Sequence, residues 1–568
     1  MEKPLSGVEA VKLGSRYLRG TLSEELANDE PLFTAPATGV LKFHGIYQQD
    51  DRDLRKSGVK QYSAMVRVGV PGGVLTPEQY LTLDRLAELG DGSLRITTRQ
   101  DIQYHYVPKA RLRELIQTLH GCYLGTLAAC GDVVRNVISC PAPFANDERK
   151  ELQPFVSYLS KNLKPKTTAY YEIWIDGEKA VSGEQNEQPQ EVEPLYGATY
   201  LPRKFKIGFT FPGDNTTDIY ANDIGIVPHY EDGVLTGFNI LAGGGMGQSA
   251  GVKSSHPRLA DPLCFVGPTC EELLEIASAI ISIHRDFGNR SNRKLARLKY
   301  VMEDWGVAKF KQELELRVGR QLADAVPLHW TRSNDYLGWR RQTLDSHGDP
   351  VWFYGVRVIS GRIRDFSPQQ RIRTGLRAVV ERYGLEVRLT CQQNMYLCGI
   401  RERDRPGVAS LLREHGIAEP LELPPVLRHA IACPALPTCA LAITESERIM
   451  PDLVGEIQSA LNQLGLQDQI IHFRTSGCPN GCSRPYTAEI GIVGASVNMY
   501  TIYLGASRLG TRLGEVFAQN VKREQLLPKL QPVFEYYKRS RQAGEYFGDF
   551  CHRIGIQALQ DVSMYAAA

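Results

Sequence analysis

The chain has 568 residues, more than one hydrophobic core normally supports, so we expect two to four domains. Its 66 Lys and Arg against 64 Asp and Glu give no global reason to expect nucleic-acid binding. No apolar run approaches the roughly 18 residues of a membrane span, and the N-terminus lacks the apolar core of a secretory signal. We therefore expect no membrane association and a reducing, cytoplasmic location.

The first elements predicted along the chain are a strand, a turn, a helix and a second strand. V-R-V (66–68) is β-branched and alternating, as strands are. Apolar residues at helical spacing follow the proline of T-P-E-Q (76–79), which suits the first turn of a helix. L-R-I-T-T-R-Q-D (94–101) then predicts the second strand.

The same series returns in the second half of the chain. V-R-V (356–358) leads to S-P-Q-Q (367–370), from whose proline we expect a helix, and then to V-R-L-T-C-Q-Q-N (387–394). Further matched segments keep the same order: R-N-V-I-S-C-P-A (135–142) with R-H-A-I-A-C-P-A (428–435), K-F-K (204–206) with H-F-R (472–474), D-I-G-I-V (223–227) with E-I-G-I-V (489–493), and F-N-I-L-A-G (238–243) with Y-T-I-Y-L-G (500–505). This order predicts a duplicated α+β fold with a pseudo-twofold axis and one central interface for a cofactor.

Two segments between the repeats carry weaker signals. Residues 255–325 have a helical pattern, and their charged stretch N-R-S-N-R-K-L-A-R-L-K (289–299) is interpreted as a solvated helix face. G-G-G-M-G (243–247) imitates a phosphate loop only weakly, so we expect a turn close to the cofactor.

Four cysteines form two close pairs in the second half. They are Cys433 and Cys439, then Cys478 and Cys482, in A-C-P-A-L-P-T-C and S-G-C-P-N-G-C-S-R-P. The spacing fits zinc knuckles poorly and favours a [4Fe–4S] cluster, although zinc and unrelated buried cysteines remain alternatives. The other eight cysteines are expected to be buried small hydrophobic residues.

The first half has cations where the second has cysteines. These are Arg67, Arg95, Arg99, Arg135, Arg203, Lys204 and Lys206. A strand period of two places Lys204 and Lys206 on one face. Cations that face inward are costly unless they meet anions, so they predict a polyanionic ligand, and a lysine among arginines should have a lowered pKa.

These motifs together resemble the sirohaem- and [4Fe–4S]-containing sulfite/nitrite reductase family over nearly the whole chain. The segments that carry the resemblance are S-R-Y-L-R-G (15–20), F-H-G-I-Y-Q-Q-D-D-R-D (43–53), T-R-Q (98–100), Y-L-P-R-K-F-K (200–206), G-F-N-I-L-A-G-G-G (237–245), both cysteine motifs, L-G-A-S-R-L-G-T-R (504–512) and A-G-E-Y-F-G-D-F (543–550).

The resemblance implies roles for individual residues. Cys433, Cys439, Cys478 and Cys482 would bind the cluster, and Cys482 would also bridge it to the sirohaem iron. Four cations would line the anion-binding face: Arg67, Arg135, Lys204 and Lys206. Arg95 and Arg99 would contact sirohaem carboxylates, and Asn480 would lie beside the cofactor.

The resemblance also implies a three-domain, mixed α/β fold with the cofactors at the domain interface. The expected parts are an N-terminal arm (1–63), paired ferredoxin-like half-domains (64–128 with 330–412), a first sirohaem-binding α+β domain (129–329) and a second domain with the cysteines (413–568).

The implied reaction is the assimilatory six-electron reduction of sulfite to sulfide. A sirohaem nitrite reductase is the nearest alternative, but such relatives typically have a neutral residue where Lys206 stands. A non-catalytic iron–sulfur electron-transfer protein is a more distant one. Because the chain has no convincing dinucleotide or flavin motif, electrons should come from a partner, either an NADPH-dependent flavoprotein subunit or a ferredoxin.

Overall fold

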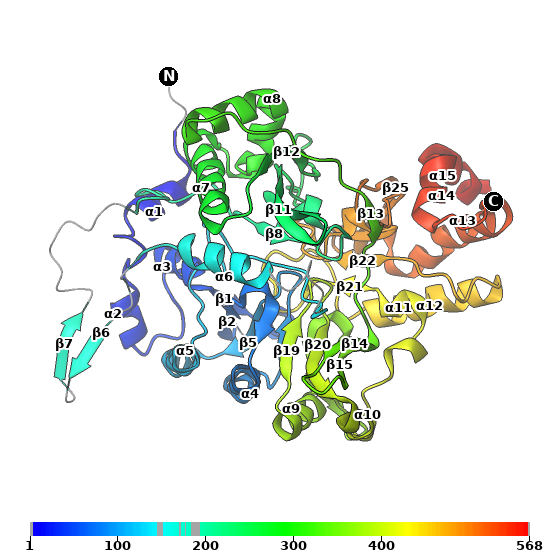
Figure 1. Ribbon diagram of the computed structural model, residues 1–568, viewed down its shortest axis with the longest axis horizontal. Coiled ribbons are helices and arrows are strands. Elements are labelled where there is room, and N and C mark those ends of the chain that lie inside the picture. Colours follow the sequence, from blue (N-terminus) through cyan, green and yellow to red (C-terminus); the bar gives the residue numbers. More distant parts are fainter. Residues whose placement is uncertain are drawn as a thin grey trace.

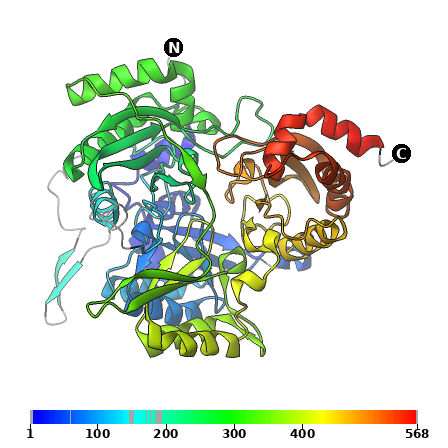
Figure 2. The ribbon, with the colours of Figure 1, turned by 45° about the vertical axis from the view of Figure 1, so that its right-hand side comes forward.

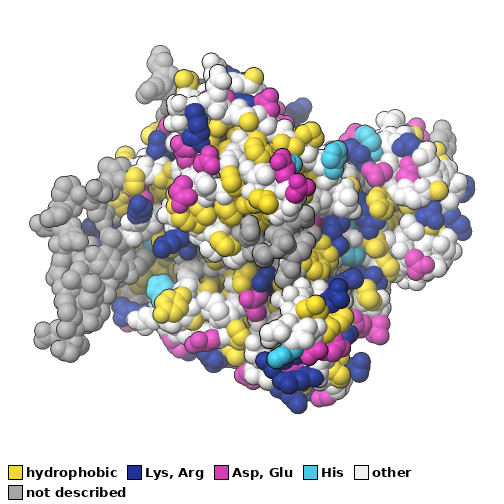
Figure 3. Space-filling view, viewed as in Figure 1, with side chains coloured by type: hydrophobic (Ala, Val, Ile, Leu, Met, Phe, Trp, Pro, Cys, Tyr) yellow, Lys and Arg dark blue, Asp and Glu magenta, His cyan; other side chains and the backbone are white. Residues whose placement is uncertain are grey.

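The computed structural model shows two paired half-domains and two larger α+β domains (Figure 1). It describes residues 4–58, 60–144, 152–167, 169, 172–175, 178–182 and 193–565. In Figures 1 and 2 the first large domain (green) lies above the half-domains (blue and yellow-green), and the second (orange to red) lies to their right. On the face seen in Figure 3, acidic and basic side chains are interspersed, in keeping with the balanced charge. Among the described residues, no helix is long and apolar enough to cross a membrane.

Each half-domain is an antiparallel sheet covered by two helices. The first sheet has the order β1-β2-β5-β4-β16 and the second the order β14-β15-β20-β19-β3. The elements of the first are β1 (Ile46–Asp50), β2 (Tyr62–Val68), β4 (Leu94–Ile96), β5 (Ile102–Val107), α4 (Pro77–Leu86) and α5 (Leu112–Gly121). Those of the second are β14 (Gly338–Leu344), β15 (Pro350–Val356), β19 (Glu386–Leu389), β20 (Met395–Arg401), α9 (Ile372–Tyr383) and α10 (Arg405–Glu414).

The two half-domains exchange a short strand. β3 (Val74–Leu75) leaves the first repeat and pairs with β19 of the second, whereas β16 (Arg362–Ile363) leaves the second and pairs with β4 of the first. The backbones approach so closely that a Cβ on Gly73 would lie 2.4 Å from the Leu389 carbonyl oxygen, and one on Gly361 would lie 2.2 Å from that of Ile96. Each glycine also has a positive φ, so both positions require glycine.

Each large domain contains a mixed sheet packed against helices. The first sheet has the order β12-β11-β10-β8 and the second the order β21-β22-β23-β24-β25. The first domain contains β8 (Ile207–Phe209), β10 (Ile224–Glu231), β11 (Val234–Ala242), β12 (Asp261–Val266), α6 (Leu152–Asn162), α7 (Cys270–Phe287) and α8 (Leu298–Val318). The second contains β21 (Ile431–Ala432), β22 (Phe473–Ser476), β23 (Ile490–Ser496), β24 (Met499–Leu504), β25 (Glu515–Lys522), α11 (Pro425–Arg428), α12 (Met450–Gln463), α13 (Leu526–Ser540), α14 (Phe547–Ile554) and α15 (Ile556–Tyr565).

Shorter elements complete the described part of the chain. They are α1 (Gly7–Leu13), α2 (Leu22–Ala27), α3 (Ala35–Leu41), β6 (Glu172–Ile175), β7 (Glu178–Ser182), β9 (Gly213–Asp214), β13 (Trp330–Arg332), β17 (Asp365–Ser367) and β18 (Gln370–Arg371). One apolar core runs from the half-domains into the first large domain, and a second core lies within the second large domain.

The strand pairing in the structure corrects two of the alignments that the sequence suggested between the repeats. Because Val68 pairs with Ile102 and Val356 pairs with Met395, V-R-V at 66–68 matches residues 354–356 rather than 356–358. Tripeptide identity alone cannot detect a shift of two residues, since it leaves strand faces unchanged.

The second correction concerns the strands of the large domains. Ile224 pairs with Ile207, and its counterpart Ile490 pairs with Phe473, so Lys206 matches His472 instead of Arg474. Lys204 therefore matches Ile470.

Two element predictions were also wrong. The helix expected from Pro368 begins at Ile372, because β17 and β18 form a small hairpin first. Residues 261–266, expected to be helical, are strand β12. β1, from the expected N-terminal arm, is an edge strand of the first half-domain sheet.

The charged stretch 289–299 is not a solvated helix face. Arg293 pairs with the Asp132 carboxylate at 2.7 Å, and Arg297 pairs with that of Asp223 at 2.8 Å. Arg290 pairs with buried Glu9 of α1. The Arg290–Glu9 pair ties the N-terminal segment to the first large domain, whereas the other two pairs lie within that domain.

Candidate functional site

The two cysteine motifs meet at one edge of the second large sheet. β21 and β22 are parallel neighbours, Cys433 directly follows β21, and Cys478 follows β22 after one glycine. The Gly477 amide donates to the Cys433 Sγ at 3.2 Å. Parallel neighbours end at the same edge, so residues 45 positions apart become adjacent.

The four thiols lie close enough to influence one another. Burial raises the pKa of Cys433 and of Cys478 to about 12, and the neighbouring Cys482 adds to both shifts. Burial also raises the pKa of Cys439, again with Cys482 as the next contributor. Thiols with raised pKa values stay protonated on their own. They would lose their protons on binding a positively charged inorganic core, so they fit a site that such a core completes.

The quartet does not have the shape of a single-ion site. Among the described residues, no three His, Cys, Asp or Glu side chains converge closely enough to hold one metal ion. Zinc would draw four sulfurs to about 2.3 Å from one point. This arrangement gives no support to a single zinc ion held by the four thiols.

Cys482 differs from the other three because it is exposed. Its backbone carbonyl accepts a hydrogen bond from the Thr98 hydroxyl at 3.0 Å, which joins this loop to T-R-Q (98–100). Asn480 donates to the Cys478 Sγ at 3.4 Å. The 243–247 turn packs on the same loop, since the Gln248 amide donates to the Pro479 carbonyl at 2.9 Å. The prediction that G-G-G-M-G forms a turn rather than a phosphate loop is therefore supported.

The predicted anion-binding cations gather opposite Cys482. Arg67 lies on β2, Lys206 directly precedes β8, and Lys204 lies two residues earlier. Cys482 is among the charged groups that act on all three. Arg135 joins them as the neighbour with the largest electrostatic effect on Lys204. The structure thus brings the cations of one half and the exposed thiol of the other into one site.

The lysines of this site lose their protons unusually easily. Burial, followed by Arg135, lowers the pKa of Lys204 to about 7. Burial and then Lys204 itself lower the pKa of Lys206 well below its usual value. The expected direction of these shifts is confirmed. The Lys204 ammonium could release a proton near neutral pH, and the Lys206 ammonium loses its proton more easily than that of an ordinary lysine.

An acid and a thiol lie behind Arg67. Its Nη1 donates to the Cys130 Sγ at 3.0 Å, and its Nε lies 4.0 Å from the Asp101 carboxylate. Burial raises the pKa of Asp101 to about 7, although Arg67, Arg99 and Arg135 act in the opposite direction. One oxygen of Asp101 is buried without a hydrogen-bond partner.

Arg95 and Arg99 are buried or half-buried and already hold protein partners. Arg95 donates to the Glu447 carboxylate at 3.1 Å and to the Ala432 carbonyl at 2.8 Å. Arg99 donates to Asn222, Asn136 and Ile207 at distances of 2.6–2.9 Å, and only its Nε lacks a partner. Their contacts with cofactor carboxylates stay a prediction.

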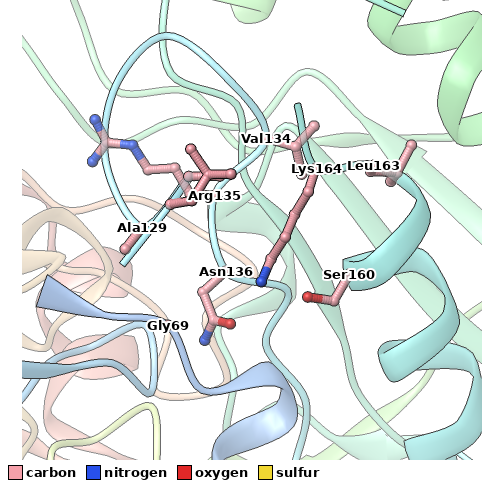
Figure 4. Close-up of a pocket in the computed structure, with 10 residues that line it drawn as sticks. Gly69, Ala129, Val134, Arg135, Asn136, Ser160, Leu163 and Lys164 are labelled. Carbon is pink, nitrogen blue, oxygen red and sulfur yellow. The ribbon is translucent and has the colours of Figure 1, made fainter. Parts of the chain in front are cut away.

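A small pocket borders the site on the side of the first large domain (Figure 4). Its lining includes Arg135, Asn136, Ser160 and Lys164. In Figure 4 the Lys164 amine lies between Asn136 and Ser160, whereas the Arg135 guanidinium points away from them. Arg135 is thus shared between the pocket wall and the cation-lined face.

Sequence reasoning missed three residues that support the site. Asp223 accepts from the Lys206 backbone amide at 2.8 Å and pairs with Arg297, so it fixes the strand that carries the lysine. Lys299 is buried and donates to the Gly245 and Gly247 carbonyls of the turn. Asp223 lies in a repeated segment, and Arg297 and Lys299 lie in the charged stretch 289–299. Neither pattern shows which residues these side chains contact.

Comparisons with known proteins agree with this geometry. A family model described as "Nitrite/Sulfite reductase ferredoxin-like half domain" matches residues 58–122 and 345–415. Another, "Nitrite and sulphite reductase 4Fe-4S domain", matches residues 157–322, which lie in the half without the four cysteines. A "Sulfite reductase [ferredoxin]" of Synechococcus elongatus is 43% identical over 98% of this chain and 91% of that protein. The chain belongs to the nitrite and sulfite reductase family.

Further relatives strengthen the assignment. A "Sulfite reductase [NADPH] hemoprotein beta-component" of Myxococcus xanthus is 43% identical over 97% of both chains, and one of Geobacillus kaustophilus is 41% identical over 97% of this chain and 96% of that protein. The solved NirA protein of Mycobacterium tuberculosis superposes with a TM-score of 0.78 over 98% of both chains at 24% identity, which supports the fold. The predicted family and duplicated fold are confirmed.

The raised pKa of Asp101 predicts a pH-dependent stability. Between the ordinary pKa of about 4 and the folded value of about 7, the folded protein holds a proton that the unfolded chain does not. The stability contributed by this proton is present below pH 4 and is lost as the pH rises through 7. Asp101→Asn should therefore gain stability relative to the wild type between pH 5 and 8, by an amount on the order of 2–4 kcal/mol.

Thermal unfolding at several pH values measures this effect. Asp468→Asn, which changes an exposed carboxylate, is the matched control and should follow the wild type. An Asp101→Asn difference that does not change with pH would contradict the assignment.

Proposed function

We propose that the chain is the catalytic hemoprotein of an assimilatory sulfite reductase and performs the six-electron reduction of sulfite to sulfide at a sirohaem linked to a [4Fe–4S] cluster. One observation carries the proposal: the exposed Cys482, last of the four cysteines, is near enough to Arg67, Lys204 and Lys206 to act on all three electrostatically. Relatives named sulfite reductase align over nearly the whole chain.

The side chains present fit both groups. The four thiols come together without converging on a single-ion point, as a cluster core requires. Half-buried Lys204 and Lys206, together with the unpartnered Arg99 Nε, suit a ligand rich in carboxylates. Cys433, Cys439, Cys478 and Cys482 would hold the cluster, and Cys482 would link it to the sirohaem. Arg95, Arg99 and Asn480 would contact the sirohaem or flank it.

Sirohaem and the cluster supply the electron transfer when bound. The chain's own residues bind the sulfite dianion, orient it and deliver protons. Arg67 and Arg135 keep their charge and attract the anion. Both lysines have lowered pKa values, that of Lys204 about 7, so they are suited to protonate an oxygen as its bond to sulfur breaks and water leaves.

The second lysine should favour sulfite over nitrite. Lys206→Asn removes one cation and one proton donor, so we expect kcat/KM for sulfite to fall by at least tenfold, because each lost charge-assisted contact weakens binding by about 1.5–3 kcal/mol. The monoanion nitrite should be affected less. Steady-state rates with both substrates measure the ratio, and Lys60→Asn, an exposed lysine outside the site, serves as control.

A nitrite reductase would show the opposite substrate preference. A wild-type chain that reduces nitrite and is inert towards sulfite would refute the proposal.

Cys482 should be the bridging thiolate. Cys482→Ser should abolish the magnetic and optical coupling between haem and cluster, whereas Cys551→Ser, a buried cysteine away from the site, should leave it intact. Absorption and electron paramagnetic resonance spectra of the purified proteins give the readout. A variant with an unchanged coupled spectrum would disprove the bridge, and a colourless wild-type protein would support a non-catalytic metal protein instead.

Electrons should come from a separate protein, either a ferredoxin or an NADPH-dependent flavoprotein, since relatives of both kinds align equally well. NADPH alone should give no turnover with the isolated chain, and adding one of the two donors should restore it. Turnover with NADPH alone would contradict this expectation. All twelve cysteines are free, which supports a reducing, cytoplasmic location.

A further inference from the structure

Arg52 lies in the segment F-H-G-I-Y-Q-Q-D-D-R-D (43–53), to which the proposed reaction gives no role. It follows β1 in the first half of the chain, yet it contacts the loop that carries Cys439, 387 positions later. Its Nη1 donates to the Ala442 carbonyl at 2.5 Å and to the Cys439 carbonyl at 3.4 Å. Its backbone amide donates to the Pro437 carbonyl at 3.3 Å. Three contacts from one residue thus span residues 437–442.

The segment around Arg52 is itself anchored. The Asp51 carboxylate accepts from the Tyr106 hydroxyl at 3.0 Å, and that of Asp53 pairs with Arg448 at 2.7 Å. Tyr106 belongs to the first half-domain and Arg448 to the second large domain. Arg52 is therefore held from both sides, and its position relative to the cysteine loop is fixed.

The charge of Arg52 lies beside the loop that carries the thiol. Its Nη1 donates to the carbonyl of Cys439 itself, so the guanidinium is held against the backbone of this proposed cluster ligand. No described carboxylate lies within 4.0 Å of the Arg52 guanidinium, so no direct ion pair cancels its charge there. A cation that stabilises a thiolate also stabilises added negative charge on the core that the thiolate binds.

We propose that Arg52 is a positioning residue for the Cys439 loop and that its fixed charge raises the reduction potential of the iron–sulfur cluster bound there. The inference rests on the proposed cluster ligands. Reduction adds one electron to a core already surrounded by four thiolates, so a nearby cation favours the reduced state more than the oxidised one. The hydrogen bonds keep the loop in register, and the charge sets the potential.

Three variants separate the two roles. Arg52→Lys keeps the charge and one donor, Arg52→Gln keeps a donor without the charge, and Arg52→Met loses both. Arg55→Gln is the matched control, because Arg55 is an exposed arginine three residues later that pairs with Asp50 and has no contact with the loop. Iron and acid-labile sulfide content and a redox titration followed by electron paramagnetic resonance are measured on each purified holoprotein.

The charge role predicts a more negative cluster potential in Arg52→Gln and in any cluster-containing fraction of Arg52→Met, with Arg52→Lys and Arg55→Gln close to the wild type. The positioning role predicts a loss of cluster content in Arg52→Met. A wild-type potential in Arg52→Gln would overturn the charge role, and full cluster content in Arg52→Met would overturn the positioning role. Absence of any iron–sulfur cluster from the wild-type protein would instead refute the proposed function.

Discussion

The buried contact between Arg484 and Asp218 holds the two halves of the chain together at the site. The Arg484 Nε lies 2.5 Å from the Asp218 carboxylate, and its two terminal nitrogens donate to the carbonyls of Thr98 and Cys391 at 3.1 and 2.9 Å. Thr98 and Cys391 occupy equivalent positions of the two half-domains. Asp218 and Arg484 are also equivalent, since each has a left-handed backbone and precedes a matching 3₁₀ turn. One side chain two residues after Cys482 therefore joins both half-domains and both large domains near the pseudo-twofold axis. Because removing one partner leaves the other charge buried, this contact fixes the cysteine loop against the cations.

The corrected register explains why a duplicated fold gives a one-sided site. Arg67 corresponds to Gly355, Lys204 to Ile470 and Lys206 to His472. Burial lowers the pKa of His472 well below its usual value, so it is neutral. Of the four cations on the anion-binding face, only Arg135 has a charged counterpart, Arg428. The second half thus lacks positive charge at three of the four positions where the first half concentrates it, and it alone carries the four cysteines.

The sequence predicted the residues that carry the chemistry of the site better than the residues that hold them in place. Cys433, Cys439, Cys478 and Cys482 could be found because thiols at short spacing have few structural uses outside metal binding. Partners such as Asp223 for Lys206, or Asp132 for Arg293, could not, because a charged residue in a sequence does not show whether it faces water or an acid. Periodicity located the repeats but not their exact register, since a two-residue shift preserves every alternation. The extra hairpin before α9 was missed for a similar reason, as a proline suits a turn as well as a first helical residue.

The exchanged strands have a consequence for biosynthesis. Leu75 of β3, in the first repeat, pairs with Val387 of β19, in the second. The partner of β3 is therefore synthesised only after more than half of the chain has emerged. Until then the edges of β4 and β3 stay unpaired, and a nascent chain at this stage exposes backbone groups that can recruit other strands. Contacts of such large sequence separation form slowly. A fragment containing only the first repeat would lack the β16 edge of its own sheet, so its β4 edge would stay open to pairing with other chains.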